Sequence, residues 1–142
     1  MKYKEYKEIM SKEINEFVDA NCIWAFGKEQ LEQALKERNL TQEQFQNEYC
    51  GFIGGGAIRK DKVKEYLEIC EKQNAKLKEL LNDEKFACDA LYDELANHEY
   101  GYTGNETPAL EALGLTADDI VENPVLNRAF CQAVQEIRKQ DL

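Results

Sequence analysis

The chain has 142 residues, of which 43% are hydrophobic and 32% are charged, and its formal net charge is −10. This length suits a single domain over residues 1–142, and this balance is typical of a folded chain rather than a disordered one. No apolar run reaches the roughly 18 residues of a membrane span, and the N-terminal segment lacks the apolar centre of a signal peptide. We therefore expect a cytoplasmic protein with no membrane partner.

The cysteines argue against both a disulfide framework and a zinc site. All five stand singly, without a CxxC pair, and the chain has only one histidine: Cys22, Cys50, Cys70, Cys88 and Cys131. We expect reduced, mostly buried thiols, no metal and no cofactor.

The first half of the chain alternates helices with short extended runs. Residues 6–18 carry an apolar stripe at helical spacing that ends near Asp19, and a run of strand-forming residues follows near 22–26. A second helix is expected from Lys28 to Arg38, and Thr41-Gln42-Glu43-Gln44 matches a capping box that opens a short helical turn. Further strands are expected near 49–53 and 57–59.

The second half is helical throughout. Asp61 is expected to cap a helix that runs to about Leu81, and another helix follows Asn82-Asp83 and ends near His98. Thr107-Pro108 predicts an N-cap, with Gly114 as the stop, and short and long helices follow Thr116 and Asn123-Pro124. The expected fold is a mostly helical α+β domain with one small antiparallel sheet.

The excess negative charge is confined to one segment. Residues 83–122 contain eleven acidic residues and one base, Lys85, which leaves the rest of the chain neutral. Such a segment repels nucleic acid and attracts basic surfaces. The alternative interpretation is a solvated acidic face that only keeps the protein soluble. The expected partner-binding residues are Asp89, Asp93, Glu94, Glu99, Glu106, Glu111, Asp118 and Asp119, together with Tyr100 and Tyr102, whose rings offer apolar area with a polar tip.

Gly54, Gly55 and Gly56 form the most unusual short stretch. They match neither a dinucleotide fingerprint nor a P-loop, and an extended apolar pattern resumes directly after them. Glycine adopts the positive φ of tight turns, which favours a hairpin or a bulge. The alternative is an anion-binding loop assisted by Arg59, Lys60 and Lys62.

His98 is the one candidate for acid–base chemistry, with Glu99 or Asp93 as its neighbour. No nucleophile, metal triad or second histidine accompanies it. The favoured interpretation is a packed residue that binds carbonyl groups at the end of its helix. No catalytic residue is therefore assigned.

Four stretches resemble, in order, a family of small uncharacterised proteins of bacteriophages and mobile elements in Gram-positive bacteria: NCIWAFGKEQLEQALKE, GFIGGGAIRKDKV, ELANHEYGYTGN and ALEALGL. The resemblance covers residues 21–115 through an FFAF-KEQ pattern, a GGGF-type turn and an NHEY segment. This chain has Ile23-Trp24 where two phenylalanines are usual, and Ala57 where an aromatic residue often follows the glycines. What the resemblance implies is a small accessory protein that acts in the host-cell cytoplasm on host defence or host enzymes.

Two functions follow as hypotheses. The first is a non-enzymatic, acidic inhibitor of a host nucleic-acid-handling defence system (anti-CRISPR-like), which binds a host protein with a basic surface and does not bind nucleic acid directly. The second is a small-molecule or nucleotide-binding module, or a small hydrolase, that uses the glycine turn, Arg59, Lys60 and His98. A homo-oligomer is a third alternative.

Overall fold

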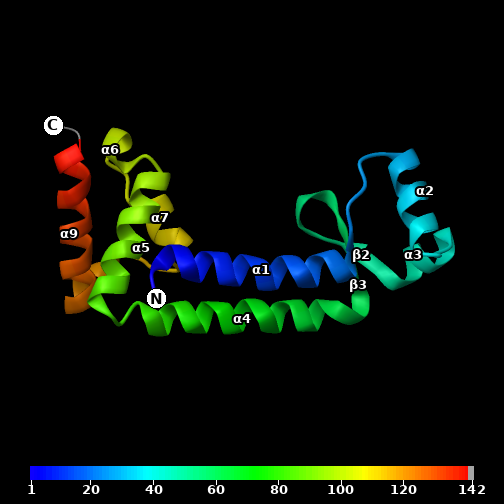
Figure 1. Ribbon diagram of the computed structural model, residues 1–142, viewed down its shortest axis with the longest axis horizontal. Coiled ribbons are helices and arrows are strands. Elements are labelled where there is room, and N and C mark those ends of the chain that lie inside the picture. Colours follow the sequence, from blue (N-terminus) through cyan, green and yellow to red (C-terminus); the bar gives the residue numbers. More distant parts are fainter. Residues whose placement is uncertain (141–142) are drawn as a thin grey trace. The chain divides into compact units, whose positions relative to one another are not determined.

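The computed structural model describes residues 1–140 and shows a mostly helical chain with one small antiparallel sheet (Figure 1), which confirms the predicted α+β class. The chain divides into two compact units. The sheet unit comprises residues 10–71, and the helical unit comprises residues 1–9 with the described residues from Lys72 onward. Helices α1 (Tyr3–Asn21) and α4 (Val63–Leu80) contribute residues to both units. The expectation of a single domain stays a prediction.

The sheet unit combines three short strands with two short helices and parts of α1 and α4. Its remaining elements are β1 (Cys22–Ile23), α2 (Lys28–Glu37), α3 (Gln42–Glu48), β2 (Tyr49–Gly51) and β3 (Ala57–Arg59), with 3₁₀ turns at Ile53–Gly55 and Lys60–Lys62.

Strand β3 lies in the centre of the sheet and pairs antiparallel with both β1 and β2. Ile58 stands opposite Cys22 and Cys50, and it is 2% exposed. Because side chains alternate along a strand, Ile23 and Ala57 belong to the other face. The sheet thus has one face built around Ile58 and one around Ala57.

The strand predicted near 22–26 ends at Ile23, and the one predicted near 49–53 ends at Gly51. The residues after these points pack against the glycine loop instead of extending the strands. Trp24 and Phe52 pack ring against ring, with centroids 5.8 Å apart, and Gly27 has φ +112°, which turns the chain into α2. Tertiary packing thus overrides strand propensity here.

The glycines close a hairpin, as predicted, although residues 52–56 form a longer loop than a two-residue turn. Gly54 and Gly55 have φ of +73° and +83°, which other residues rarely adopt. Gly56 is required for a different reason: a Cβ there would lie 2.5 Å from Cζ3 of Trp24. Two of the glycines shape the loop and the third makes room for a tryptophan.

The helical unit is built on the packing of α5 (Glu84–Asn97) against α9 (Pro124–Gln140). Leu91, Leu95, Ala129 and Ala133 in these two helices are completely buried. Shorter helices complete the unit: α6 (Tyr100–Thr103), α7 (Thr107–Ala112) and α8 (Ala117–Glu122).

Several predicted helix boundaries are confirmed by their hydrogen bonds. Thr41 and Gln44 form the expected capping box, Asp83 accepts from the N–H groups of Lys85 and Phe86, and Gly114 ends α7 at φ +69°. Two predicted caps are wrong. The N-cap of α7 is Glu106, and Thr107 is its first helical residue. Asp61 does not cap α4, which begins at Val63 after a 3₁₀ turn, because the Asp61 carboxylate pairs with Arg59.

Helix α6 was not predicted. It forms because Glu99 takes the left-handed conformation, with φ 57°, directly after α5 ends. Non-glycine residues rarely adopt the left-handed conformation, so nothing in the sequence indicates that the chain turns at Glu99. Within residues 1–140, no helix is both long and apolar enough to cross a membrane.

Candidate functional site

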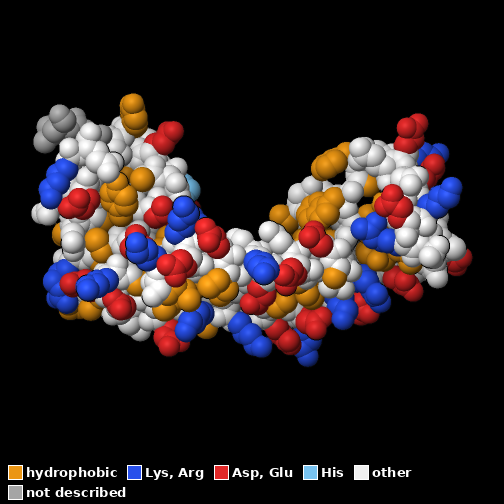
Figure 2. Space-filling model, in the orientation of Figure 1, with side chains coloured by type: hydrophobic (Ala, Val, Ile, Leu, Met, Phe, Trp, Pro, Cys, Tyr) orange, Lys and Arg blue, Asp and Glu red, His pale blue; other side chains and the backbone are white. Residues whose placement is uncertain are grey.

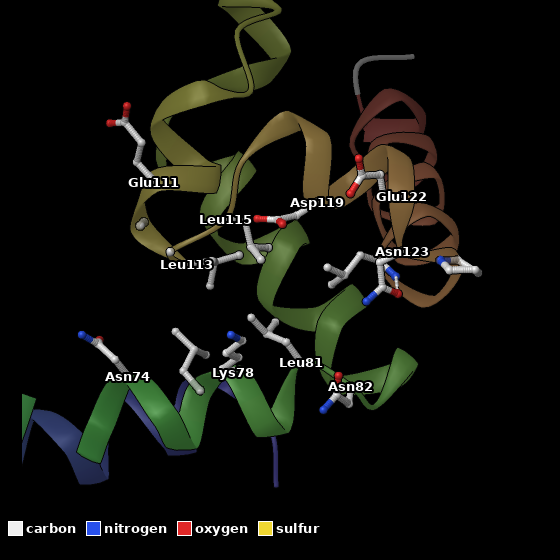
Figure 3. Close-up of a pocket in the computed structure, with 15 residues that line it drawn as sticks. Asn74, Lys78, Leu81, Asn82, Glu111, Leu113, Leu115, Asp119, Glu122 and Asn123 are labelled. Carbon is white, nitrogen blue, oxygen red and sulfur yellow. Dashed lines mark hydrogen bonds between the residues drawn. The ribbon is translucent and has the colours of Figure 1, made fainter. Parts of the chain in front are cut away.

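A pocket of about 860 Å³ lies in the helical unit between the end of α4 and the loops that flank α7 and α8 (Figure 3). Its wall is partly apolar, formed by leucine, alanine and proline side chains: Leu77, Leu81, Ala112, Leu113, Leu115, Pro124 and Leu126. Its volume falls in the range typical of ligand pockets, about 300–1,000 Å³.

The two sides of the pocket come from elements far apart in the sequence. In Figure 3, Lys78 of α4 and Leu81, directly after α4, lie on one side of the pocket, and Leu113 and Leu115 lie on the other. Leu77, Leu81 and Leu113 are buried, which makes the floor of the pocket a continuation of the core.

Carboxylates and amides form the rim. Glu111, Asp119 and Glu122 line the pocket with Asn82 and Asn123, and Lys78 is the cation among the lining residues. In Figure 3 the carboxylates of Glu111 and Glu122 point away from α4. The site therefore presents an apolar floor with a surplus of negative charge at its edge.

Local hydrogen bonds hold this rim in place. Thr116 and Asp119 form a capping box at the start of α8, with Asp119 Oδ2 accepting from Thr116 N–H at 2.8 Å. Asn123 Oδ1 accepts from the N–H groups of Val125 and Leu126 and so caps α9. Asp119 and Asn123 are therefore positioned by helix capping, whereas Glu111 and Glu122 have no ion-pair partner among residues 1–140.

Three other predicted acids cluster around the start of α1. The backbone N–H of Tyr3 donates to Asp89 at 2.9 Å, and the ammonium group of Lys7 contacts Asp93 at 3.5 Å. Glu94 accepts from the Tyr3 hydroxyl at 2.7 Å and from Lys7 at 3.1 Å, both through Oε1. These contacts join α1 to α5 within the helical unit.

The expectation that Glu94 belongs to an exposed acidic surface is wrong, because Glu94 is only 5% exposed. Burial would raise the pKa of its carboxyl, but hydrogen bonds from Tyr3 and Lys7 and the nearby charges of Lys7 and His98 outweigh this and lower it. Burial and the hydrogen bond to Glu94 raise the pKa of the Tyr3 hydroxyl, so Tyr3 stays a donor. Glu94 is thus an ionised, internally satisfied group.

His98 is also placed differently from the prediction. Its Nε2 lies 3.3 Å from Oε2 of Glu94, one turn earlier in α5, and its side chain is 38% exposed. It therefore contacts a carboxylate rather than the carbonyl groups at the end of the helix. A carboxyl with a lowered pKa is a poor general base near neutral pH, since a general base works best with a pKa near the working pH.

The remaining predicted residues are spread over the surface of the helical unit. Tyr102 is 95% exposed and Tyr100 is half-buried, both in α6. Three more acids have no ion-pair partner within the described part of the chain: Glu99, Glu106 and Asp118. On the face that Figure 2 presents, acidic and basic side chains are intermingled rather than gathered into one acidic patch.

The glycine loop and its basic neighbours belong to the sheet unit, whereas His98 belongs to the helical unit. Arg59 pairs with Asp61 at 3.0 Å and Lys62 with Glu65 at 3.2 Å, while Lys60 is exposed. The packing of Trp24 accounts for Gly56 without an anion.

Sequence reasoning missed the α4 side of the pocket and the Tyr3–Lys7 contacts with Glu94. The apolar stripe of α4 was recognised, but nothing in the pattern shows that Leu77 and Leu81 face a loop rather than a helix. Among residues 1–140, no three histidine, cysteine, aspartate or glutamate side chains come together as a metal site, and the cysteines are free thiols.

A family model covers residues 5–136, and the chain belongs to that family, which is described as a family of unknown function (DUF7659). No curated protein and no solved structure matches the chain.

Proposed function

We propose that this chain is a non-enzymatic binding protein whose pocket in the helical unit takes a basic, amphipathic segment of a partner protein. The observation that carries the proposal is the composition of the pocket: leucines on the floor, and at the rim Glu111 and Glu122, which have no ion-pair partner among residues 1–140. A segment with lysine or arginine on one side and apolar side chains on the other matches both features.

The charge distribution supports this choice of partner. The eleven acidic residues and single base of residues 83–122 repel nucleic acid, and two of those acids, Glu111 and Glu122, line the pocket without an ion-pair partner in the described part of the chain. Six of the other nine carboxylates in the segment are engaged in the fold: Asp83 and Asp119 cap helices, Asp89 accepts from the Tyr3 N–H, Glu84 and Asp93 form ion pairs, and Glu94 is buried. The other three, Glu99, Glu106 and Asp118, have no ion-pair partner among residues 1–140 and do not line the pocket. The binding role therefore rests on the pocket rim rather than on a general acidic face.

Calorimetry with a synthetic basic amphipathic helix tests the proposal. The double variant Glu111→Gln/Glu122→Gln should bind this peptide about 3–10 times more weakly, since exposed charge pairs contribute up to about 1 kcal/mol each. The matched control is Glu32→Gln/Glu43→Gln, which removes the same charge from exposed positions in the sheet unit. Equal loss in both variants, or no loss in either, would contradict the proposal.

A finer proposal concerns the partner's identity. The resemblance to phage and mobile-element proteins and the acidity of residues 83–122 support an anti-CRISPR-like inhibitor that occupies a basic surface meant for phosphates, in the host-cell cytoplasm. The chain should then displace DNA from a host defence nuclease in a mobility-shift assay. The Glu111→Gln/Glu122→Gln variant should displace it less well, and failure of the wild type to displace DNA from any such nuclease would rule out this partner class.

A further inference from the structure

The sheet unit holds a second pocket, an open hollow of about 330 Å³ bordered by the sheet, α2, α3 and the glycine loop. Leu31 comes from α2, Phe45 from α3, Ile23 and Ala57 from adjacent strands, and Gly55 and Gly56 from the loop. None of its lining residues carries a formal charge at neutral pH. The pocket is thus distinct from the carboxylate-rimmed pocket of the helical unit in both location and chemistry.

The walls of this pocket are largely apolar and partly aromatic. Phe45 and Tyr49 stand ring to ring, with centroids 5.4 Å apart, and Leu31, Phe45 and Ala57 are only half-buried although apolar. Apolar side chains in a closed core are normally buried completely. The half-buried side chains of this pocket therefore leave apolar surface that a bound apolar ligand would cover. The polar side-chain groups of the lining are the amide of Gln46 and the phenol of Tyr49. Cys50 stands opposite Ile58, so its thiol belongs to the other face of the sheet.

We propose that this pocket binds a small, uncharged aromatic molecule. A cavity of about 150 Å³ lined by apolar side chains holds benzene, so a volume about twice as large accommodates one or two rings. Charged ligands are disfavoured because no lining side chain offers a counter-charge, and an unpaired charge is costly to bury. This ligand class differs from the phosphate that Arg59 and Lys60 suggested, and neither of those residues lines the pocket.

Gly51 gives a direct way to close the pocket. It lies in β2 and lines the pocket, and a Cβ built on it meets no atom within 4 Å, so an added side chain would enter open space. Its φ lies outside the left-handed region, which means that a larger residue is not strained there. Gly51→Leu should therefore fill the pocket without disrupting the strand.

The test is ¹⁹F NMR titration with three probes of similar size: 4-fluorotoluene, 4-fluorobenzoate and 4-fluorobenzylammonium. We expect saturable binding of 4-fluorotoluene to the wild type and at least about tenfold weaker binding of both charged probes. Gly51→Leu should abolish binding, whereas Asn47→Leu, which adds the same side chain at an exposed position of α3 outside the lining, should not. No saturable binding, equal affinity for charged probes, or unchanged affinity in Gly51→Leu would overturn the proposal.

A second readout uses the unmodified chain and does not depend on the folding of a variant. Phe45 and Tyr49 line the pocket, while Tyr102 is 95% exposed in α6 and belongs to the other unit. In NMR spectra, bound 4-fluorotoluene should give intermolecular NOEs to the ring protons of Phe45 and Tyr49 and none to those of Tyr102. Absence of these NOEs, or equal NOEs at Tyr102, would contradict the proposal, as would a dimer in light scattering, because a second copy would then fill the pocket.

Discussion

Glu94 shows how one residue can look functional in the sequence and be structural in the fold. It lies in the most acidic segment of the chain, yet its carboxylate is buried and accepts hydrogen bonds from Tyr3 and Lys7. A buried carboxylate without these donors would be strongly destabilising. The contacts therefore explain why an ionised acid is tolerated beside the core of α5.

Glu94→Gln should lower the stability of the protein at neutral pH by about 1–3 kcal/mol, because buried donors lose a charged acceptor. The pKa of Glu94 is lower in the folded state than in the unfolded state, so its contribution is present above the unfolded value, about 4.3, and is lost as the pH falls through the folded value. Urea unfolding should show a difference between wild type and variant that is present at neutral pH and shrinks below about pH 4. Glu99→Gln, at an exposed position, is the control, and a difference that grows in acid would refute this account.

The glycines of the hairpin loop also act through packing, at single positions. Gly56→Ala should cost roughly 1–3 kcal/mol, because its Cβ would lie 2.5 Å from Cζ3 of Trp24 and one of the two must move. Gly51→Ala meets open space and should be neutral or slightly stabilising. Trp24 is the only tryptophan, so its emission should shift to longer wavelength in Gly56→Ala alone. An unshifted emission with unchanged stability would show that Trp24 does not need this glycine.

At the scale of elements, the pairing of α5 with α9 organises the helical unit. Both helices present completely buried leucine or alanine side chains to the core, and the caps at Asp83 and Asn123 define where they begin. The short helices α7 and α8 between them supply the rim of the candidate site. Loss of the α5–α9 core should therefore affect both stability and the pocket.

Leu91→Ala should destabilise the protein by about 2–5 kcal/mol, as expected for a completely buried leucine that leaves a cavity. Val121→Ala in α8, where the side chain is 74% exposed, should change stability by less than about 0.5 kcal/mol. Thermal or urea unfolding followed by circular dichroism measures both. Similar losses in the two variants would indicate that α5 is not part of the cooperative core.

Much of the fold was predictable because local signals and tertiary packing agree. The capping box at Thr41, the helix starts after Asp83 and Asn123, and the stop at Gly114 all lie where the sequence indicated. The pattern failed where long-range contacts decide: Trp24 leaves the strand to cover glycines some thirty residues later, and Tyr3 and Lys7 bury Glu94. Of the candidate site, the carboxylates were predictable from charge, but their separation into rim, cap and buried positions was not.

At the scale of the whole molecule, the chain carries a net charge of −10 whose excess lies in residues 83–122. The fold uses several of those acids internally and leaves others unpaired. We propose that Glu111 and Glu122, which lack ion-pair partners among residues 1–140 and line a pocket with a leucine floor, recognise a basic partner. Charge recognition of this kind weakens as salt screens it, over a length of about 10 Å at 0.1 M.

The most direct test is the salt dependence of binding to the basic amphipathic peptide, from about 0.05 to about 0.5 M NaCl, for wild type, Glu111→Gln/Glu122→Gln and Glu32→Gln/Glu43→Gln. We predict that the affinity of the wild type and the control falls steeply with salt, whereas the rim variant starts weaker and falls less. Parallel slopes for all three proteins, or a wild-type affinity that is indifferent to salt, would contradict the account.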